Sequence, residues 1–567
     1  MMSLKRSAVS DAPPDGCRNE KGESVFRCGN LVYTRKGLVF LFAWMLWGDF
    51  CFTLMEAVVP SILPLKLKSL ESANWLIGAI MSTLPGIFNT TVCPWVSFKS
   101  DRYRSKWGRR IPFILYTMPF LTVSLIMIGC SDSLGAWVHG AFFQGSGVRQ
   151  ASVIIILLAV FAGSFDLFNM FVGSVYAYLF NDVVPEQFMG RFMGYFRLVG
   201  VASGAGFNFF VFKYAESHMR EIYLGAALLY FAGFGLMCLK VKEREYPPFL
   251  NEGRAPGLLD DIRTFARECY SISFYWNIFL DNVCGAVGQC MLSFLVFFYM
   301  SVGLNLDLIG KITAISGVLT AVCLAFAGSF VDKWHPVRVS VYLVPLTSVA
   351  TLNWCAWLWI EGAPPPMLFF WAMVTFCVFN SFSIALIVAA SMPRTMALFP
   401  HERYGQFCGA QALLRSGGTM FGGVLAGLFI DFARGISPGG HDAYRFIYVW
   451  QLVFGAASAF FYCRSYRAWK RLGAERGYVP PSKRFSMREL LARPPMTPAD
   501  SVCFNHSLAG IGGLVFFGLL IFDLVFAVYY GFFNHQVRNA VVFSVQAALI
   551  LALAPMYPRL LRFIERD

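Results

Sequence analysis

The sequence predicts an all-α membrane protein. Three observations predict this class: an apolar composition, a series of long apolar segments and a one-sided distribution of basic residues. Of the 567 residues, 57% are hydrophobic and only 14% are charged. A water-soluble chain of this length needs more charge to cover its surface. The net charge of +14 therefore points to loops beside a membrane and not to nucleic-acid binding.

The apolar segments are long enough for fourteen crossings of a bilayer. A helix needs about 20 mostly apolar residues to cross the hydrocarbon region. Twelve such segments lie near 38–63, 74–96, 111–130, 152–180, 192–212, 222–239, 275–300, 308–331, 337–360, 367–392, 407–432 and 444–463. Two more follow near 507–531 and 537–557. We therefore expect twelve membrane helices followed by two additional ones.

The basic residues predict the orientation of these helices. Most of the 47 Lys and Arg residues fall in loops on one side of the membrane if the N-terminus is cytoplasmic. Because Lys and Arg are enriched in cytoplasmic loops, we expect both termini to be cytoplasmic. The polar tail at 1–37 has no apolar core and predicts no cleavable signal peptide. This pattern suits a plasma membrane or a bacterial inner membrane.

An internal repeat divides the first twelve segments into two halves. Four identities at equal spacing join the loop after the fourth segment to the loop after the tenth: Pro185 with Pro400, Gly190 with Gly405, Phe192 with Phe407 and Gly194 with Gly409. Two six-helix units in the same orientation are the plan of the major facilitator fold, in which the site lies between the halves. We expect these halves at 38–239 and 275–463.

The remaining parts of the chain connect or extend these halves. We expect a cytoplasmic linker at 240–274 and a basic cytoplasmic segment at 464–506. The two additional helices occupy 507–557, and a cytoplasmic tail follows at 558–567. No function is predicted for the two additional helices.

The loop after the second segment carries a distinctive charged motif. From residue 100 it reads Ser-Asp-Arg-Tyr-Arg-Ser-Lys-Trp-Gly-Arg-Arg-Ile-Pro-Phe, and its gating candidates are Asp101, Arg102, Arg104, Lys106, Gly108, Arg109 and Arg110. This run resembles the signature of the glycoside–pentoside–hexuronide cation symporters, a major facilitator family that includes melibiose permeases. Charged groups at helix ends can hold a gate shut and exchange partners when it opens. Simple retention of positive charge on the cytoplasmic side is the alternative.

The fourth segment is similar to the sucrose-transporter branch of that family. It carries Asp166-Leu-Phe-Asn169, with Asn181-Asp182 at its end. Melibiose permeases hold sodium through two carboxylates at positions that here correspond to Asn89 and Cys93, which weakens a sodium assignment. The sucrose branch has Pro-x-Arg where this chain has Val175-Tyr-Ala177. The resemblance, which covers about residues 38–465, therefore implies sugar transport without implying sucrose.

Asp166 is the predicted proton-coupling residue. An ionised carboxylate in the middle of a membrane helix costs on the order of 3 kcal/mol and normally faces a cavity or a partner. A carboxyl group shielded from water favours its protonated form, so it can load a proton on one side and release it on the other. The resemblance places the proton-carrying Asp at the same position. Asn169 shares its helix face and is a candidate contact for a sugar hydroxyl.

Further substrate-binding candidates are acidic, amide and basic side chains within the segments. Asp49 and Glu56 lie on one face of the first helix, and Asp281 in the seventh segment is the repeat partner of Asp49. Asn89 is a candidate from the second segment. Arg197 and Arg415 occupy corresponding positions in the repeat and suit the carboxylate of a uronate, or else extend to headgroups or pair with buried acids.

The predicted function is proton-coupled symport of a sugar, whether disaccharide, glycoside or uronate, by alternating access. A sodium-coupled or efflux transporter of another small solute is one alternative, and a non-transporting membrane sensor is another. No nucleophile elbow, HExxH or phosphate loop occurs, so we expect no enzyme, no catalytic residue, no metal site and no cofactor beyond the coupling H⁺. The partners are then a sugar and the lipid bilayer, and the oligomeric state stays open.

Overall fold

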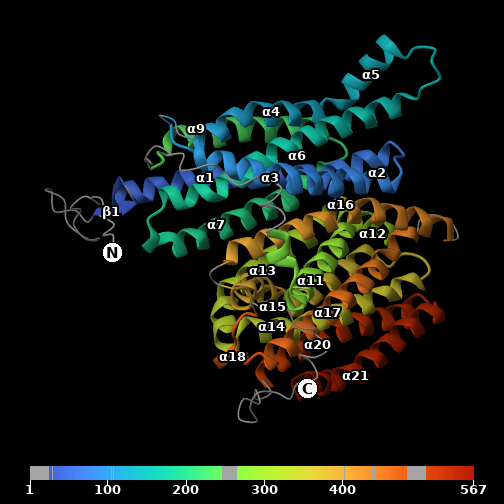
Figure 1. The fold of residues 1–567 in the computed structure, drawn as a ribbon. Coiled ribbons are helices and arrows are strands. Elements are labelled where there is room, and N and C mark those ends of the chain that lie inside the picture. Colours follow the sequence, from blue (N-terminus) through green and yellow to red (C-terminus); the bar gives the residue numbers. More distant parts are fainter. Residues whose placement is uncertain are drawn as a thin grey trace.

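The structure is a computed structural model that describes residues 25–28, 30–103, 105, 107–244, 265–400, 403–436, 442–481 and 506–566. Within these residues, 14 helices are long and apolar enough to cross a membrane. This result confirms the predicted arrangement of twelve helices followed by two. The chain is therefore a multi-pass membrane protein, and Figure 1 shows its two helical halves lying against each other.

The N-terminal half contains the first six spans. Its elements are α1 (Arg35–Ser69), α2 (Asn74–Gly78), η1 (Ala79–Thr83), α3 (Leu84–Arg102), α4 (Ile111–Gly129), α6 (Gln150–Val183), α7 (Glu186–Gly206), η2 (Phe207–Val211), η3 (Phe212–Tyr214), α8 (Met219–Leu229), η4 (Tyr230–Phe234) and α9 (Gly235–Lys240). The short π and 3-10 turns interrupt spans that otherwise run continuously. The side chain of Thr34 caps the start of α1 by accepting a hydrogen bond from the Gly37 N–H at 3.2 Å.

The C-terminal half repeats this arrangement and carries the extension. Its elements are α11 (Ser273–Gln289), η5 (Cys290–Phe294), α12 (Leu295–Ser301), α13 (Leu306–Trp334), α14 (Pro336–Trp354), η6 (Cys355–Leu358), α15 (Pro366–Leu398), α16 (Tyr404–Ile436), η8 (Asp442–Phe446), α17 (Ile447–Arg471) and α18 (Ala474–Gly477). The extension consists of α20 (His506–Val528), η10 (Tyr529–Phe533) and α21 (Val537–Arg566). Helix α20 packs on α14 and α15, and α21 packs on α20, so the extension belongs to the C-terminal half.

A hairpin and a short helix beside the N-terminal half lie outside the predicted spans. A hairpin of β1 (Val25–Cys28) and β2 (Leu31–Thr34) precedes α1, within the segment expected to be a polar tail. Its Phe26 ring packs edge-on against Phe188 at 4.9 Å, which fixes the hairpin to the start of α7. Helix α5 (Ser131–Phe142) follows α4 and has too few residues to cross a bilayer.

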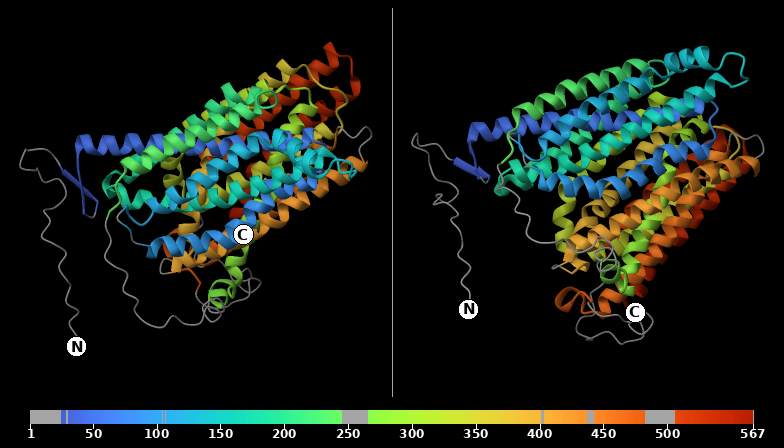
Figure 2. Two further views of the ribbon diagram at one scale, coloured as in Figure 1. Left: turned by 90° about the horizontal axis from the view of Figure 1, so that it is seen from above. Right: turned by 45° about the horizontal axis from the view of Figure 1, so that its top comes forward.

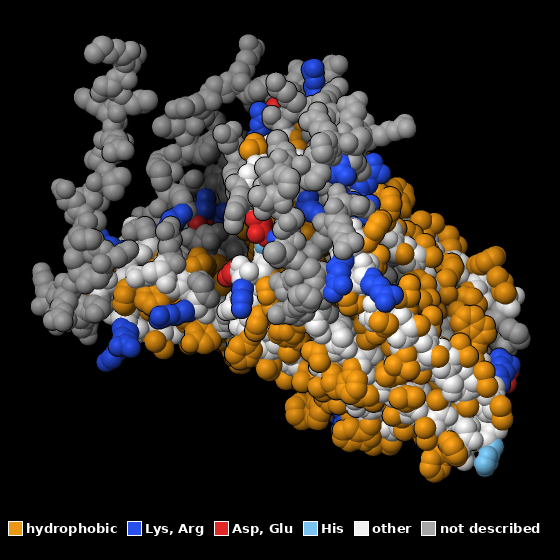
Figure 3. Space-filling model, turned by 90° about the horizontal axis from the view of Figure 1, so that it is seen from below, with side chains coloured by type: hydrophobic (Ala, Val, Ile, Leu, Met, Phe, Trp, Pro, Cys, Tyr) orange, Lys and Arg blue, Asp and Glu red, His pale blue; other side chains and the backbone are white. Residues whose placement is uncertain are grey.

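The spans end at two faces of the bundle. We call the end that holds the α3–α4 and α6–α7 connections the N-terminal face, and the end that holds the α1–α2 connection the far face. Figure 3 shows Lys and Arg side chains gathering toward the N-terminal face, while hydrophobic side chains cover the flank. The far face is where α2 of the N-terminal half packs against α16 of the C-terminal half.

The two halves meet closely at the far face and diverge toward the N-terminal face (Figures 1 and 2). A Cβ atom at Gly78 would collide with the carbonyl oxygen of Gly423, so glycine is needed for α2 and α16 to approach so closely. Near the N-terminal face, by contrast, a Cβ added at Gly194 of α7 or Gly409 of α16 would meet open space. The structure is therefore closed at the far face.

Candidate functional site

An acidic cavity of about 330 Å³ lies between α1, η1, α3, α6 and η5. It contains side chains from both halves, since Ser293 of η5 contributes to its wall. The lining residues are Glu56, Val59, Pro60, Leu63, Ile80, Met81, Pro85, Ala162, Phe165, Asp166, Asn169 and Ser293. A concave site with a mostly apolar wall and a few convergent polar groups is typical of small-molecule binding.

Three of the predicted site residues meet in this acidic cavity. The Asn169 side-chain N–H donates to Glu56 Oε1 at 3.1 Å, which joins α6 to α1. Asp166 lies one turn away from Asn169 on the same face of α6. Among the described residues, Asp166 has no hydrogen-bond or ion-pair partner, and Asn169 Oδ1 is a buried acceptor without a donor. These oxygens are available to a proton, a cation or a hydroxylated solute.

The charge of the acidic cavity is one-sided. Its described lining contains two carboxyl groups and no Lys, Arg or His side chain. A carboxylate away from bulk water is costly unless it is paired, protonated or bound to a cation. The cavity therefore has the chemistry of a proton or cation site combined with hydrogen-bond acceptors for a neutral solute.

Asp49 lies outside this cavity, although it is on the same helix as Glu56. Its side chain is buried between α1 and α7, where it accepts a hydrogen bond from the Thr53 hydroxyl at 3.4 Å. Arg197 of α7 is the basic group whose charge acts on it. Arg197 itself is exposed, as are Asn89 and Arg415, and none of these three lines the acidic cavity.

Asp281 is held in a buried ion pair within the C-terminal half. Its carboxylate accepts hydrogen bonds from Arg394 of α15 at 2.9 Å and from Ser458 of α17 at 2.7 Å. The Arg394 guanidinium in turn stacks over the Tyr462 ring at 3.9 Å. These contacts join α11, α15 and α17, and they neutralise the charge of Asp281 away from the acidic cavity.

The charged loop motif forms part of an ion-pair cluster at the N-terminal face. Arg109 donates two hydrogen bonds to Asp182 at the end of α6, at 2.9 and 2.8 Å. Arg110 and Arg244 lie 3.5 and 3.7 Å from the same carboxylate. Asp182 is completely buried and thus holds together the ends of α4, α6 and α9. We call Arg109, Arg110, Asp182, Glu243 and Arg244 the gate cluster.

Glu243 caps the start of α4 within the gate cluster. Its carboxylate accepts the backbone N–H of Arg110 at 2.9 Å and that of Ile111 at 3.3 Å. The positive end of the helix dipole stabilises a negative charge at this position. Burial raises the pKa of Glu243, and the neighbouring Asp182 carboxylate adds to this shift, whereas the backbone donors oppose it. Gly108 has φ +104° and lies directly against Glu243, so a side chain at this position would be strained and would collide.

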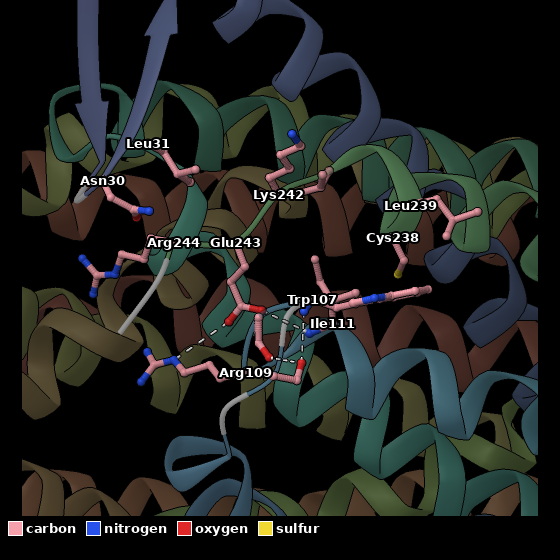
Figure 4. A pocket seen from close by; sticks show the side chains of 13 residues that line it. Asn30, Leu31, Trp107, Arg109, Ile111, Cys238, Leu239, Lys242, Glu243 and Arg244 are labelled. Atoms are coloured by element: carbon pink, nitrogen blue, oxygen red, sulfur yellow. Dashed lines mark hydrogen bonds and ion pairs between the residues drawn. The ribbon is translucent and has the colours of Figure 1, made fainter. Parts of the chain in front are cut away.

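Beside the gate cluster a second cavity of about 780 Å³ opens at the N-terminal face. Figure 4 shows Arg109 and Glu243 in its wall, with Trp107, Leu239 and Lys242 around it. The backbones of Asp101 and Arg102 end α3, but their side chains lie outside the described part of the chain, as do Arg104 and Lys106 entirely. Gly108, Arg109 and Arg110 are thus the members of the sequence motif that the structure places.

Replacing Asp182 by Ala is expected to destabilise the protein by about 3 kcal/mol, because it removes the buried carboxylate with which Arg109, Arg110 and Arg244 pair. The free energy of unfolding in mixed detergent micelles measures this loss. Asp132→Ala is the matched control, since the Asp132 side chain is 61% exposed where it pairs with Lys66. The control is expected to change the free energy by less than about 1 kcal/mol. Equal losses in the two variants would contradict a structural role for the gate cluster.

At the far face, one carboxylate joins the two halves. Asp431 of α16 accepts the backbone N–H groups of Asn74 and Trp75 at 3.2 and 3.0 Å, together with the Asn74 side-chain amide at 2.7 Å. Tyr444 donates its hydroxyl hydrogen to Asn74 Oδ1 at 2.8 Å, and Lys68 lies over the Tyr444 ring at 5.0 Å. Asp431 thus caps the start of α2 from the opposite half, and we call these residues the far-face latch.

The arrangement of the helices matches that of major facilitator transporters. The chain aligns over 75% of its length with a point mutant of the nucleoside transporter NupG, of which it covers 99%, at a TM-score of 0.56 and 12% identity. A D-xylose–proton symporter gives a TM-score of 0.55 at 12% identity over 79% of this chain and 100% of the other. A bacterial homologue of the human lysosomal transporter Spinster, inward-facing and unoccupied, gives 0.54 at 13% identity over 77% and 98%.

Sequence comparison is more limited. No protein-family model matches the chain. The sucrose transport protein SUC3 of Arabidopsis thaliana is 35% identical over 91 residues, which are 15% of this chain and 14% of that protein. The chain therefore matches only a small part of this curated relative. Together, these comparisons establish the major facilitator fold, extended here by α20 and α21.

Proposed function

We propose that this protein is a secondary transporter that moves a sugar by alternating access, coupled to protons through Asp166. The single observation that carries this proposal is the acidic cavity, in which Asp166 and Glu56 lie without a basic partner and face Ser293 of the other half. A proton on Asp166 removes the cost of its charge in the membrane, and it therefore favours the conformations in which the cavity is closed to water.

The positive-inside pattern supports a cytoplasmic N-terminal face. In that orientation the structure is closed toward the outside by the far-face latch and diverges toward the cytoplasm. This arrangement is inward-facing, and a bound solute would leave from it to the cytoplasm. Movement of the halves about the acidic cavity would release the latch, close the N-terminal face and expose the cavity to the outside.

Uptake into proteoliposomes tests this function directly. Radiolabelled pentoses, hexoses, disaccharides and nucleosides are supplied with and without an inward proton gradient, and external pH is recorded. The expected result is accumulation of at least one neutral sugar that collapses with a protonophore, together with alkalinisation of the medium. Binding without flux for every solute would instead identify a membrane sensor.

Sodium coupling is the second candidate, because Glu56, Asp166 and Asn169 supply oxygen ligands of the kind that hard cations bind. The same proteoliposomes distinguish the two ions. A sodium gradient that drives accumulation at equal pH on both sides would assign sodium as the coupling ion. We expect no such accumulation.

The charge of the acidic cavity also predicts which sugars compete. A uronate would add its own negative charge beside the carboxyl groups of Glu56 and Asp166, where the described lining supplies no cation. Glucuronate is therefore expected to compete at least tenfold more weakly than the neutral sugar of the same size. Equal competition would show that exposed Arg197 or Arg415, and not this cavity, binds the solute.

A further inference from the structure

Asp523 lies in α20, the first of the two additional helices, near the centre of the membrane span that this helix begins, and it is completely buried. The span Gly510–Phe533 that contains it is strongly apolar. A buried charge needs a cation or several hydrogen-bond donors. The partners of Asp523 therefore determine whether it carries a charge.

Among the described residues, Asp523 receives a single hydrogen bond. The Asn353 side-chain N–H of α14 donates to Asp523 Oδ1 at 3.2 Å, and Oδ2 is a buried acceptor without a donor. No Lys, Arg or His of the described chain pairs with it. Asp281, in contrast, is equally buried but accepts hydrogen bonds from both Arg394 and Ser458. The protein thus supplies a cation where a buried carboxylate keeps its charge.

A second orphan acceptor lies in the same polar group. Gln546 of α21 donates its side-chain N–H to the backbone oxygen of Asn353 at 2.6 Å. Its own Oε1 is buried and has no donor. The group formed by Asn353, Asp523 and Gln546 therefore has two acceptor oxygens in need of hydrogens. One proton on Asp523 converts an acceptor of this group into a donor and removes the charge.

We infer that Asp523 binds a proton and, as a neutral carboxylic acid, joins the two additional helices to α14. Burial and the shortage of donors carry this inference, which does not depend on the proposed function. The inferred proton is a resident one, because Asp523 lines neither of the two cavities described above. Its site differs in this respect from Asp166, which lines a cavity.

Contacts near both ends of the helix pair support this attachment. At the far face, Asn539 Nδ2 donates to the Glu361 oxygen at 2.8 Å, and Arg538 pairs with the Glu361 carboxylate. Nearer the N-terminal face, the Tyr557 hydroxyl donates to the backbone oxygen of Tyr342 of α14. Asp523 is thus the middle one of three attachments that join α20 and α21 to the C-terminal half.

Infrared difference spectroscopy tests the proton directly. The spectrum of the wild-type protein minus that of Asp523→Asn, in bilayers, is expected to contain the C=O stretch of a protonated carboxyl group at every pH at which the protein stays folded. Antisymmetric and symmetric carboxylate bands in place of that stretch would overturn the inference.

Stability measurements on two variants, for which different unfolding temperatures are expected, complete the test. Asp523→Asn keeps both an acceptor for Asn353 and a donor, and it is expected to unfold at nearly the wild-type temperature. Asp523→Leu removes both groups and is expected to unfold at a lower temperature and to speed amide exchange in 510–557. A large loss of thermal stability in Asp523→Asn would show that the negative charge itself is required, which also contradicts the inference.

Discussion

Replacing Asp166 by Asn is expected to abolish proton-driven accumulation of the solute while leaving exchange of solute across the membrane. Asn has nearly the shape of a protonated Asp, but it cannot release a hydrogen ion. The variant therefore mimics the loaded carrier permanently. In proteoliposomes, accumulation against a gradient should fall at least a hundredfold, whereas counterflow of labelled solute should stay within about threefold of the wild type.

The pH dependence of exchange provides a second readout of the same variant. In the wild type, exchange should slow as the pH rises, because the deprotonated carboxylate in the acidic cavity opposes closure. Asp166→Asn should remove this dependence. Asp132→Asn, at an exposed ion pair with Lys66, is the matched control and should keep both accumulation and the pH profile. Normal accumulation in Asp166→Asn would assign coupling to another group, and Glu56 is then the first to examine.

The sequence was sufficient to predict the membrane class, the number of spans and the division into halves. Each of these depends on the length and periodicity of apolar segments, which the bilayer thickness constrains strongly. The β1–β2 hairpin was not predicted, because its two four-residue strands lie in a polar region and are held by packing such as Phe26 against Phe188. Helix α5 was missed for a related reason, since its 12 residues cannot span the membrane.

From the sequence, the candidate site was predictable only for residues that share one face of a single helix. Asp166 and Asn169 share a face of α6, and the structure brings both to the acidic cavity with Glu56. Which helix faces a given residue is a matter of tertiary packing. Sequence spacing could not show that Asp281 pairs with Arg394, which lies more than one hundred residues away.

Two carboxylates that join elements of the structure were not identified from the sequence. Asp431 is an acidic residue within a predicted span, and such residues are functional candidates by default. The sequence therefore contained enough information to select Asp431 as a candidate. Glu243 lies after the sixth span in a charged stretch, where nothing distinguishes it from its neighbours. Its importance arises from the backbone N–H groups at the start of α4, and only the three-dimensional structure shows that these groups point toward it.

The far-face latch explains how one conformation can be held without a permanent bond. Hydrogen bonds to Asp431 come mainly from the backbone at the start of α2, so they require the two halves to be in contact. The contacts described for the gate cluster, in contrast, join the N-terminal half to the residues that directly follow α9 and not to the C-terminal half. The latch is therefore expected to contribute to the free-energy difference between the two conformations.

Replacing Asp431 by Ala is expected to destabilise the arrangement closed at the far face by about 3 kcal/mol, because three hydrogen bonds to a charged acceptor are lost. This energy corresponds to a population shift of roughly a hundredfold toward the arrangement that is open at the far face. Pulsed electron spin resonance measures the shift, with nitroxide labels at exposed Phe142 of the N-terminal half and exposed Phe532 of the C-terminal extension. The labels are placed in a background from which reactive cysteines have been removed, and the distance between them should lengthen.

Asp307→Ala is the matched control for this experiment, because Asp307 lies at the same face but pairs with Lys311 of its own helix at 2.6 Å. It should leave the distance distribution unchanged. Asp431→Asn should give an intermediate shift, since its amide oxygen can still accept one of the two backbone hydrogens at the start of α2. If Asp431→Ala and Asp307→Ala give the same distribution, the halves are held together at the far face by glycine packing and not by the latch.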